Sequence, residues 1–164
     1  MIVVSDTSPI NYLVLIGHVQ VLHSLFDQVF IPDAVYRELQ NPGTPPKVIS
    51  WMAVPPAWLS RKSVTSTLQG EAFERLGAGE QEAIALAAVM GDSVTLLIDE
   101  RRGRAVAEGL NIRTIGVLGI LEAAAEHGLI DLPSAIDLLT QTSFYVQPSI
   151  LKALMDRHRE KNRG

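Results

Sequence analysis

Leu96-Leu97-Ile98-Asp99-Glu100 carries a run of branched apolar side chains directly into two carboxylates. Such a run, followed by a helix-forming segment, predicts a buried central strand that presents Asp99 at its carboxyl end. The chain opens in the same way, because the apolar stretch 2–5 ends in Asp6, and Ser8-Pro9 then supplies a helix cap and a first-turn proline. Ligands of open α/β sheets bind at the carboxyl edge of the strands, so we expect Asp6 and Asp99 to share one site.

Strands and helices are expected to alternate along the chain, which predicts βαβ units and an α/β fold with a mainly parallel sheet of four to five strands. The most regular helix pattern is the alanine-rich segment 80–90, which follows a flexible turn at 77–79. We expect a single domain over 1–164 with a helical C-terminal extension from about 133. The expected strands are 2–5, 29–31, 51–54, 95–98 and 111–115, and the other expected helices are two short ones within 9–25 and single ones at 34–39, 68–76, 101–109, 117–127, 133–140 and 148–159.

The composition is that of a globular protein, with 47% hydrophobic and 20% charged residues, and it argues against disorder. The absence of cysteine excludes disulfides and thiolate chemistry. No apolar run approaches the roughly 18 residues that a membrane span needs, and the first residues lack a basic leader. We therefore expect a cytoplasmic protein that does not contact a membrane.

Charge is unevenly distributed along the chain. The net charge is −4, but residues 151–164 carry +3 and leave −7 for the rest. A basic tail on an acidic body has two interpretations: contact with phosphate or an acidic partner, or a solvated C-terminal helix.

Four acids stand out by their places in the expected elements: Asp6, Glu38, Glu80 and Asp99. Taken singly, each has a simple explanation as a helix cap, a residue favoured by a helix dipole, or a surface residue. Strand ends and helix starts of one parallel sheet nevertheless converge on one edge. Carboxylates that share a cleft repel one another unless a cation neutralises them, and oxygen-only ligands select Mg²⁺ or Mn²⁺ over zinc.

The chain resembles the PIN-domain family, most closely its compact prokaryotic branch related to VapC toxins. The residues that carry the resemblance are Ser5–Ile10 (SDTSPI), Ile31–Leu39 (IPDAVYREL), Gly79–Ile84 (GEQEAI) and Leu97–Glu100 (LIDE), in that order. The resemblance implies a three-layer α/β/α fold and a metal-dependent ribonuclease that is the toxin of a toxin–antitoxin pair, in which an antitoxin encoded beside it neutralises the toxin. RNA is then the substrate and an antitoxin the expected protein partner.

By position, the resemblance implies catalytic roles for Asp6, Glu38, Glu80 and Asp99, and metal binding by Asp6, Glu80 and Asp99. Many PIN domains carry aspartate where Glu80 stands, and nearby Glu82 is an open alternative to it. Glu100 is a candidate outer ligand, whereas Asp33, a rival to Glu38, is better explained as a helix cap.

Three further side chains are candidates for supporting roles. Ser8 or Thr7 could hydrogen-bond a metal-bound water or a phosphate, although a helix cap explains these hydroxyls too. Arg104, in the basic segment 101–104, is a candidate contact for the RNA backbone, with a solvated helix start as the alternative.

Two other functions compete with a nuclease. The first is a PIN-like binding or regulatory module with weak chemistry that acts through a protein partner. The second is a phosphotransfer receiver, which needs a late strand-end lysine, and no lysine lies between Lys62 and Lys152. The apolar segments 116–125 and 150–155 could form a homodimer interface or an antitoxin seat, with core packing as the alternative.

Overall fold

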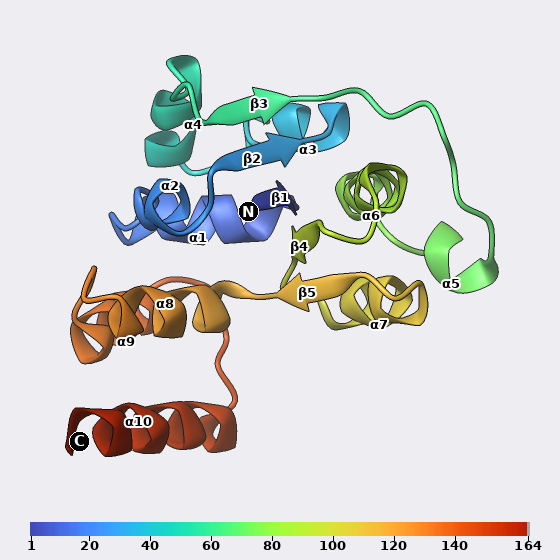
Figure 1. Ribbon diagram of the computed structural model, residues 1–164. Coiled ribbons are helices and arrows are strands. Elements are labelled where there is room, and N and C mark those ends of the chain that lie inside the picture. Colours follow the sequence, from blue (N-terminus) through green and yellow to red (C-terminus); the bar gives the residue numbers. More distant parts are fainter. Residues whose placement is uncertain (164) are drawn as a thin grey trace.

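The structure, a computed structural model, describes residues 1–163. Its centre is a parallel sheet of five strands in the order β3-β2-β1-β4-β5 (Figure 1). These strands are β1 (Ile2–Ser5), β2 (Gln28–Ile31), β3 (Leu59–Arg61), β4 (Thr95–Leu97) and β5 (Arg113–Ile115). All four strand pairings are parallel, as the alternation of strands and helices predicts.

The order of the strands reverses between β1 and β4. From β1 the chain moves outward through β2 to β3, and it then returns to add β4 and β5 on the other side of β1. Ser5 pairs with Leu97, and the backbone N–H of Asp6 donates to the Leu97 carbonyl at 2.9 Å. Asp6 and Asp99 therefore follow neighbouring strands at the switch point, where open α/β sheets bind ligands.

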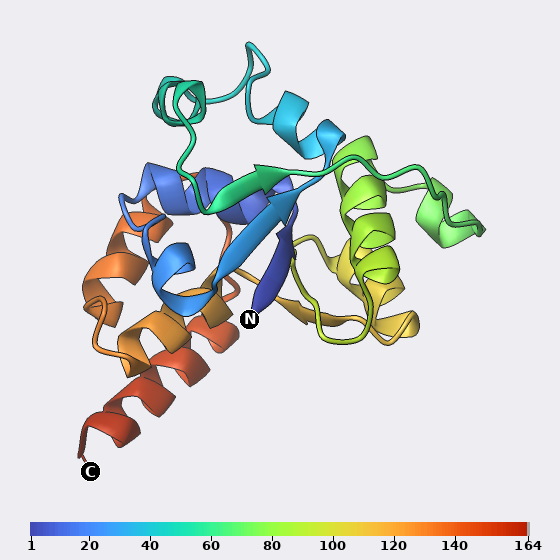
Figure 2. The same cartoon turned by 45° about the horizontal axis from the view of Figure 1, so that its top comes forward.

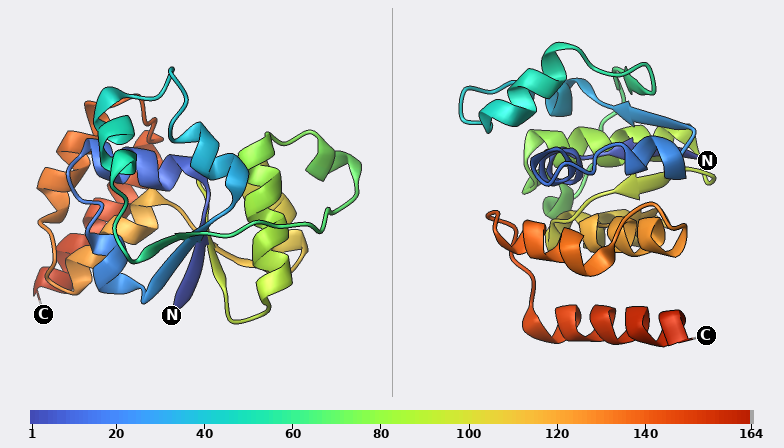
Figure 3. Two further views of the ribbon diagram at one scale, coloured as in Figure 1. Left: turned by 90° about the horizontal axis from the view of Figure 1, so that it is seen from above. Right: turned by 90° about the vertical axis from the view of Figure 1, so that its left-hand side faces the viewer.

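Apolar side chains project from both faces of the sheet into buried clusters. The strands are therefore continuous hydrophobic runs in the sequence. Val3 and Leu97 belong to one buried cluster, whereas Val4 and Leu96 belong to a second cluster on the other face. Figures 2 and 3 show α6 and α7 on one side of the sheet and α1 and α8 on the other. The fold is a three-layer α/β/α arrangement, as expected.

The helices are α1 (Thr7–Leu15), α2 (Val21–Leu25), α3 (Asp33–Glu38), α4 (Pro46–Ala53), α5 (Glu71–Glu74), α6 (Ala78–Met90), α7 (Arg101–Gly109), α8 (Val117–Glu126), α9 (Leu132–Thr140) and α10 (Pro148–Arg163). The interruption near Gly17 separates α1 from α2 as the sequence predicts. No helix among residues 1–163 is long and apolar enough to cross a membrane.

The strand expected at 51–54 is wrong, because residues 51–53 form the end of α4 and Val54 follows the helix. Val48 and Met52, one helical turn apart, are both buried, which is the helical rather than the strand pattern. Pro46 opens the helix at its first position. The edge strand of the sheet is β3, which begins after Trp58.

Two local predictions of helix starts also need correction. The segment 77–79 is not a free turn, because α6 begins at Ala78 and buries Gly79. Ser8 does not cap α1, since the helix begins at Thr7 and Asp6 occupies the cap position. In both cases the helix begins before the first residue that the pattern marks as helical.

The basic end of the chain pairs with acids of α8. Arg157 donates to Glu122 at 2.9 Å, and Lys161 pairs with Glu126. Leu154 of α10 is 2% exposed in the same core cluster as Ile120 and Leu121 of α8, and α10 lies beside α8 and α9 (Figures 1 and 3). Core packing thus accounts for most apolar positions of 116–125 and for Leu154, while a homodimer or antitoxin interface stays a prediction.

Candidate active site

Asp6 is a buried carboxylate that its helix does not use. Only 4% of the residue is exposed. It occupies the N-cap position of α1, yet its side chain accepts no capping hydrogen bond. The helix-cap explanation of Asp6 therefore does not account for its side chain. The backbone N–H of Thr7 offsets only part of the cost of burying this carboxylate, since its pKa is still raised.

Asp99 has one occupied and one free carboxylate oxygen. Its Oδ1 accepts the backbone N–H of Val117 at 2.9 Å, at the start of α8. Its Oδ2 is buried and has no hydrogen-bond partner among the residues that the structure describes. Gly116 permits this approach, because a Cβ there would lie 2.6 Å from Asp99 Oδ1. Asp99 is thus fixed in place by one oxygen, and the other is left for a ligand.

Burial raises the pKa of both aspartates. The pKa of Asp6 rises to about 7, first through burial, and the negative charges of Glu80, Glu38 and Asp99 add to this effect. The pKa of Asp99 rises to about 6, again mainly through burial, while the Val117 N–H and the charge of Arg104 oppose the rise. Perturbed carboxylates that influence one another in a cleft are typical of functional sites.

Glu80 lies in the first turn of α6, where it is partly buried. Its pKa is raised by burial first and then by the charges of Glu100 and Glu38. The negative charge of Glu80 also raises the pKa of Asp6, so the two carboxylates repel each other.

Glu38, the last residue of α3, joins three helices. Its carboxylate accepts a hydrogen bond from the Thr7 hydroxyl of α1 and another from the Gly79 N–H of α6, the latter at 3.1 Å. Both carboxylate oxygens are therefore occupied by α1 and α6. This arrangement makes Glu38 a positioning residue for the elements that carry Asp6 and Glu80.

The close packing of Glu38 on Gly79 gives a first prediction. A Cβ at Gly79 would lie 2.5 to 2.9 Å from the Glu38 carboxyl group, so Gly79→Ala must displace that side chain. We expect Gly79→Ala to lower the free energy of unfolding by about 1–3 kcal/mol. Gly77→Ala is the matched control, because a Cβ at Gly77 meets nothing within 4 Å. Equal denaturant midpoints for the two variants would contradict this contact.

The four acids do not form a closed metal cage. Within residues 1–163, no three His, Asp or Glu side chains are arranged so that they could hold an ion together. Mg²⁺ does not require such a cage, because proteins commonly bind it through one or two carboxylates, with waters and substrate phosphates completing the shell. The free oxygen of Asp99 and the buried Asp6 carboxylate fit that mode of binding.

The comparisons with known proteins agree with this geometry. A family model described as DUF3368, a PIN domain, matches residues 2–160. The chain belongs to the PIN-domain family. A PilT N-terminus domain protein from the hyperthermophilic archaeon Sulfolobus solfataricus P2 has a similar structure, with a TM-score of 0.55 at 17% identity over 77% of this chain and 96% of the other. The search of curated proteins gives no match.

Membership in the PIN family supports a nuclease-type fold. PIN domains are generally nucleases and typically use divalent metals, and at 17% identity the likeness to the archaeal protein shows the fold alone.

Several other acids near this PIN-domain site have structural partners. Glu82 accepts the Ala34 N–H at 3.0 Å and lies 3.9 Å from Arg37, so it faces α3. Glu100 caps α7 by accepting the Gly103 N–H at 2.8 Å. Asp33 is not a helix cap, because it binds Arg61 at 2.6 Å and Ser63 at 2.7 Å. Asp33 is therefore tied to the segment around β3.

Ser8 and Arg104 line one cavity of this PIN domain together with Asp99. The cavity has a volume of about 600 Å³ and extends from the carboxyl ends of β4 and β5 to the connection between α9 and α10. The residues missed were those of the connection, 143–147, because nothing in the sequence indicates that it folds back toward Asp99.

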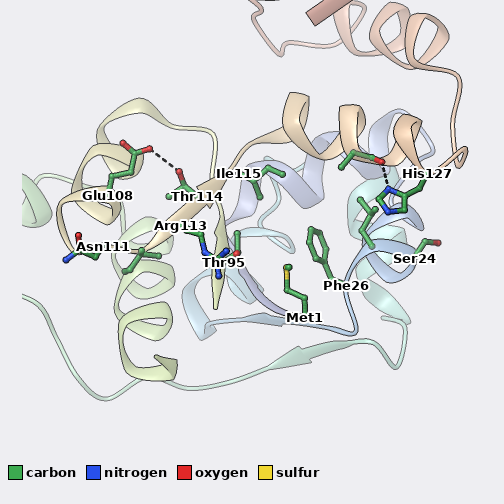
Figure 4. A pocket seen from close by; sticks show the side chains of 13 residues that line it. Met1, Ser24, Phe26, Thr95, Glu108, Asn111, Arg113, Thr114, Ile115 and His127 are labelled. Atoms are coloured by element: carbon green, nitrogen blue, oxygen red, sulfur yellow. Dashed lines mark hydrogen bonds between the residues drawn. The ribbon is translucent and has the colours of Figure 1, made fainter. Parts of the chain in front are cut away.

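A second cavity, of about 850 Å³, lies at the opposite, amino edge of the sheet. Figure 4 shows Met1, Phe26 and Ile115 in its wall. Three of its polar side chains are engaged locally, since Thr114 donates to Glu108 at 3.2 Å and His127 bonds to the Ala123 carbonyl at 2.8 Å. The carboxylates of the candidate site are absent from its lining, so we place the chemistry at the carboxyl edge.

Proposed function

We propose that this PIN domain is a Mg²⁺- or Mn²⁺-dependent endoribonuclease that hydrolyses phosphodiester bonds, and that it is the toxin of a toxin–antitoxin pair. The observation that carries the nuclease proposal is the free, buried Oδ2 of Asp99, together with the buried carboxylate of Asp6 on the neighbouring strand end, whose pKa the Asp99 charge helps to raise. Buried carboxylates with raised pKa values are stabilised most by a bound hard cation. The toxin role depends on the resemblance to the VapC-like branch and needs a protein partner as its test.

The residues of the site have separate tasks in this proposal. Asp6 and Asp99 would bind the cation, and Glu80 would add its negative charge to the site without being a third direct ligand. Bound there, a divalent cation supplies charge for the phosphate and activates water for an in-line displacement. Arg104 lines the cavity that Asp99 also lines, where it offers the phosphate a cationic partner. Glu38 and the Val117 N–H keep the carboxylates in place.

The direct test is cleavage of a labelled single-stranded RNA by the purified protein, with Mg²⁺, Mn²⁺ or EDTA. We expect cleavage only with a divalent ion, and recovery when excess metal follows EDTA. Cleavage that persists in EDTA, or in the folded Asp99→Asn variant, would contradict metal-dependent cleavage at this site. No cleavage with either metal over varied RNAs would contradict the enzyme.

A binding or regulatory module is the second candidate. It is favoured by the absence, within residues 1–163, of three acids positioned around one point. For this function we expect tight capture of a neighbouring gene product together with no metal-dependent cleavage. Capture accompanied by inhibition of cleavage would instead support the toxin.

A further inference from the structure

The cavity beside Asp99 has a second wall that the proposed chemistry does not use. The lining of the cavity includes Asp99, Glu100 and Arg104. It also includes the connection 143–147 between α9 and α10, which we call the second wall. Its volume of about 600 Å³ is within the range of small-ligand sites. The cavity is therefore larger than one cation and one phosphate require.

Aromatic rings form much of this second wall. The Tyr12 and Phe144 rings meet edge to face at 5.0 Å, and the Tyr12 hydroxyl bonds to Ser143 at 2.8 Å. These contacts fix the connection against α1. Tyr145 also lines the cavity, yet it is 79% exposed. An exposed aromatic ring on an anchored segment is a surface on which a flat ring can stack.

Polar and charged groups complete the cavity. Arg104 supplies a cation, and Gln147 supplies an amide that can both donate and accept hydrogen bonds. Asp99, a candidate ligand of the metal, lines this cavity together with Arg104, so a phosphate is expected near them and an uncharged ring near the aromatic residues. A phosphate followed by a flat ring with hydrogen-bonding edges is the chemistry of a nucleotide.

We infer that this cavity binds the nucleobase next to the scissile phosphate of a single-stranded RNA, with Tyr145 as the stacking surface and Gln147 at the edge of the base. The inference rests on the proposed nuclease function and specifies its substrate as unpaired RNA. Bases in a duplex are stacked on each other, whereas unpaired bases are free to stack on aromatic side chains. The segment that forms this wall thereby contributes to specificity.

The test measures RNA binding without cleavage. The Asp6→Asn variant, with Mg²⁺ present, is titrated with a fluorescent single-stranded oligonucleotide and followed by anisotropy. Adding Tyr145→Ala should weaken binding roughly tenfold, the effect of one lost base stack. Tyr145→Phe should bind as tightly as the parent, because its ring is retained. Val54→Ala, at a side chain 84% exposed directly after α4, is the control and should leave affinity unchanged.

A second comparison tests whether the substrate is unpaired RNA. An RNA duplex of the same length should bind with an affinity that does not depend on Tyr145. Equal single-strand affinity in Tyr145→Ala and its parent would overturn the inference, and metal-dependent cleavage by the unmodified protein would still support the proposed function. Loss of binding to a captured partner protein, with RNA affinity unchanged, would assign the wall to protein recognition instead.

Discussion

Asp99→Asn should reduce metal-dependent RNA cleavage by at least about 10²–10³-fold, because the loss of a metal ligand removes several kcal/mol of transition-state stabilisation. The change is nearly isosteric. Asparagine keeps an oxygen that can accept the Val117 N–H, which Asp99 Oδ1 accepts at 2.9 Å. The amide lacks the negative charge that a cation requires. The measurement is the initial rate of cleavage of a labelled single-stranded RNA at saturating Mg²⁺.

Asp6→Asn should cause a loss of similar size, since Asp6 is buried beside β4 and takes part in no helix cap. Asp92→Asn is the matched control, because Asp92 is exposed in the turn before β4. It should cleave at the rate of the unmodified protein. Circular dichroism and thermal unfolding must show that all three variants are folded. Cleavage within a factor of two or three in folded Asp6→Asn and Asp99→Asn would remove the physical basis of the nuclease.

The sheet and most of its connections could be predicted from the sequence because they depend on local patterns. The run Leu96–Ile98 is apolar at every position since both faces of β4 are covered. The alternation of such runs with helical segments is enough to predict a parallel sheet. The strand predicted at 51–54 is wrong because a short apolar run does not distinguish a strand from a helix. The helical spacing is shown by the buried residues Val48 and Met52, which precede the proline pair.

The candidate site could be predicted only as a set of acids at one edge. Which atoms are engaged depends on contacts between residues far apart in sequence. Glu38 meets Gly79 across 41 positions, and Asp99 meets Val117 across 18. The same holds for the wall at 143–147, whose place follows from the contact of Phe144 with Tyr12. Neither local propensity nor residue spacing contains these distances.

The raised pKa values predict that metal-free protein becomes less stable as the pH rises from about 4 to about 7. Asp6 has a pKa of about 7 when folded against an ordinary 3.8, and Asp99 about 6 against 3.8. Between these values the folded state binds more protons than the unfolded state, so the free energy of unfolding falls with pH. At pH 8 both groups are charged and the full cost is present. For Asp6 that cost is at most about 4 kcal/mol. Asp6→Asn should therefore unfold at a higher temperature than the unmodified protein at pH 8 in EDTA.

A divalent cation should reverse this effect, because it compensates the buried charges in the folded state alone. At about 100 times its dissociation constant, a ligand that binds only the folded state stabilises it by about 2.7 kcal/mol. For a chain of this size that is a rise of roughly 5–10 °C in the unfolding midpoint. Mg²⁺ or Mn²⁺ at pH 8 should raise the midpoint of the unmodified protein and of Asp92→Asn, but not that of the Asp6→Asn/Asp99→Asn double variant. Because this readout needs no RNA, it separates metal binding from catalysis. An equal rise of the midpoint in the double variant would show that the ion binds elsewhere. No rise in any of the proteins would contradict the proposal that a cation binds at this site.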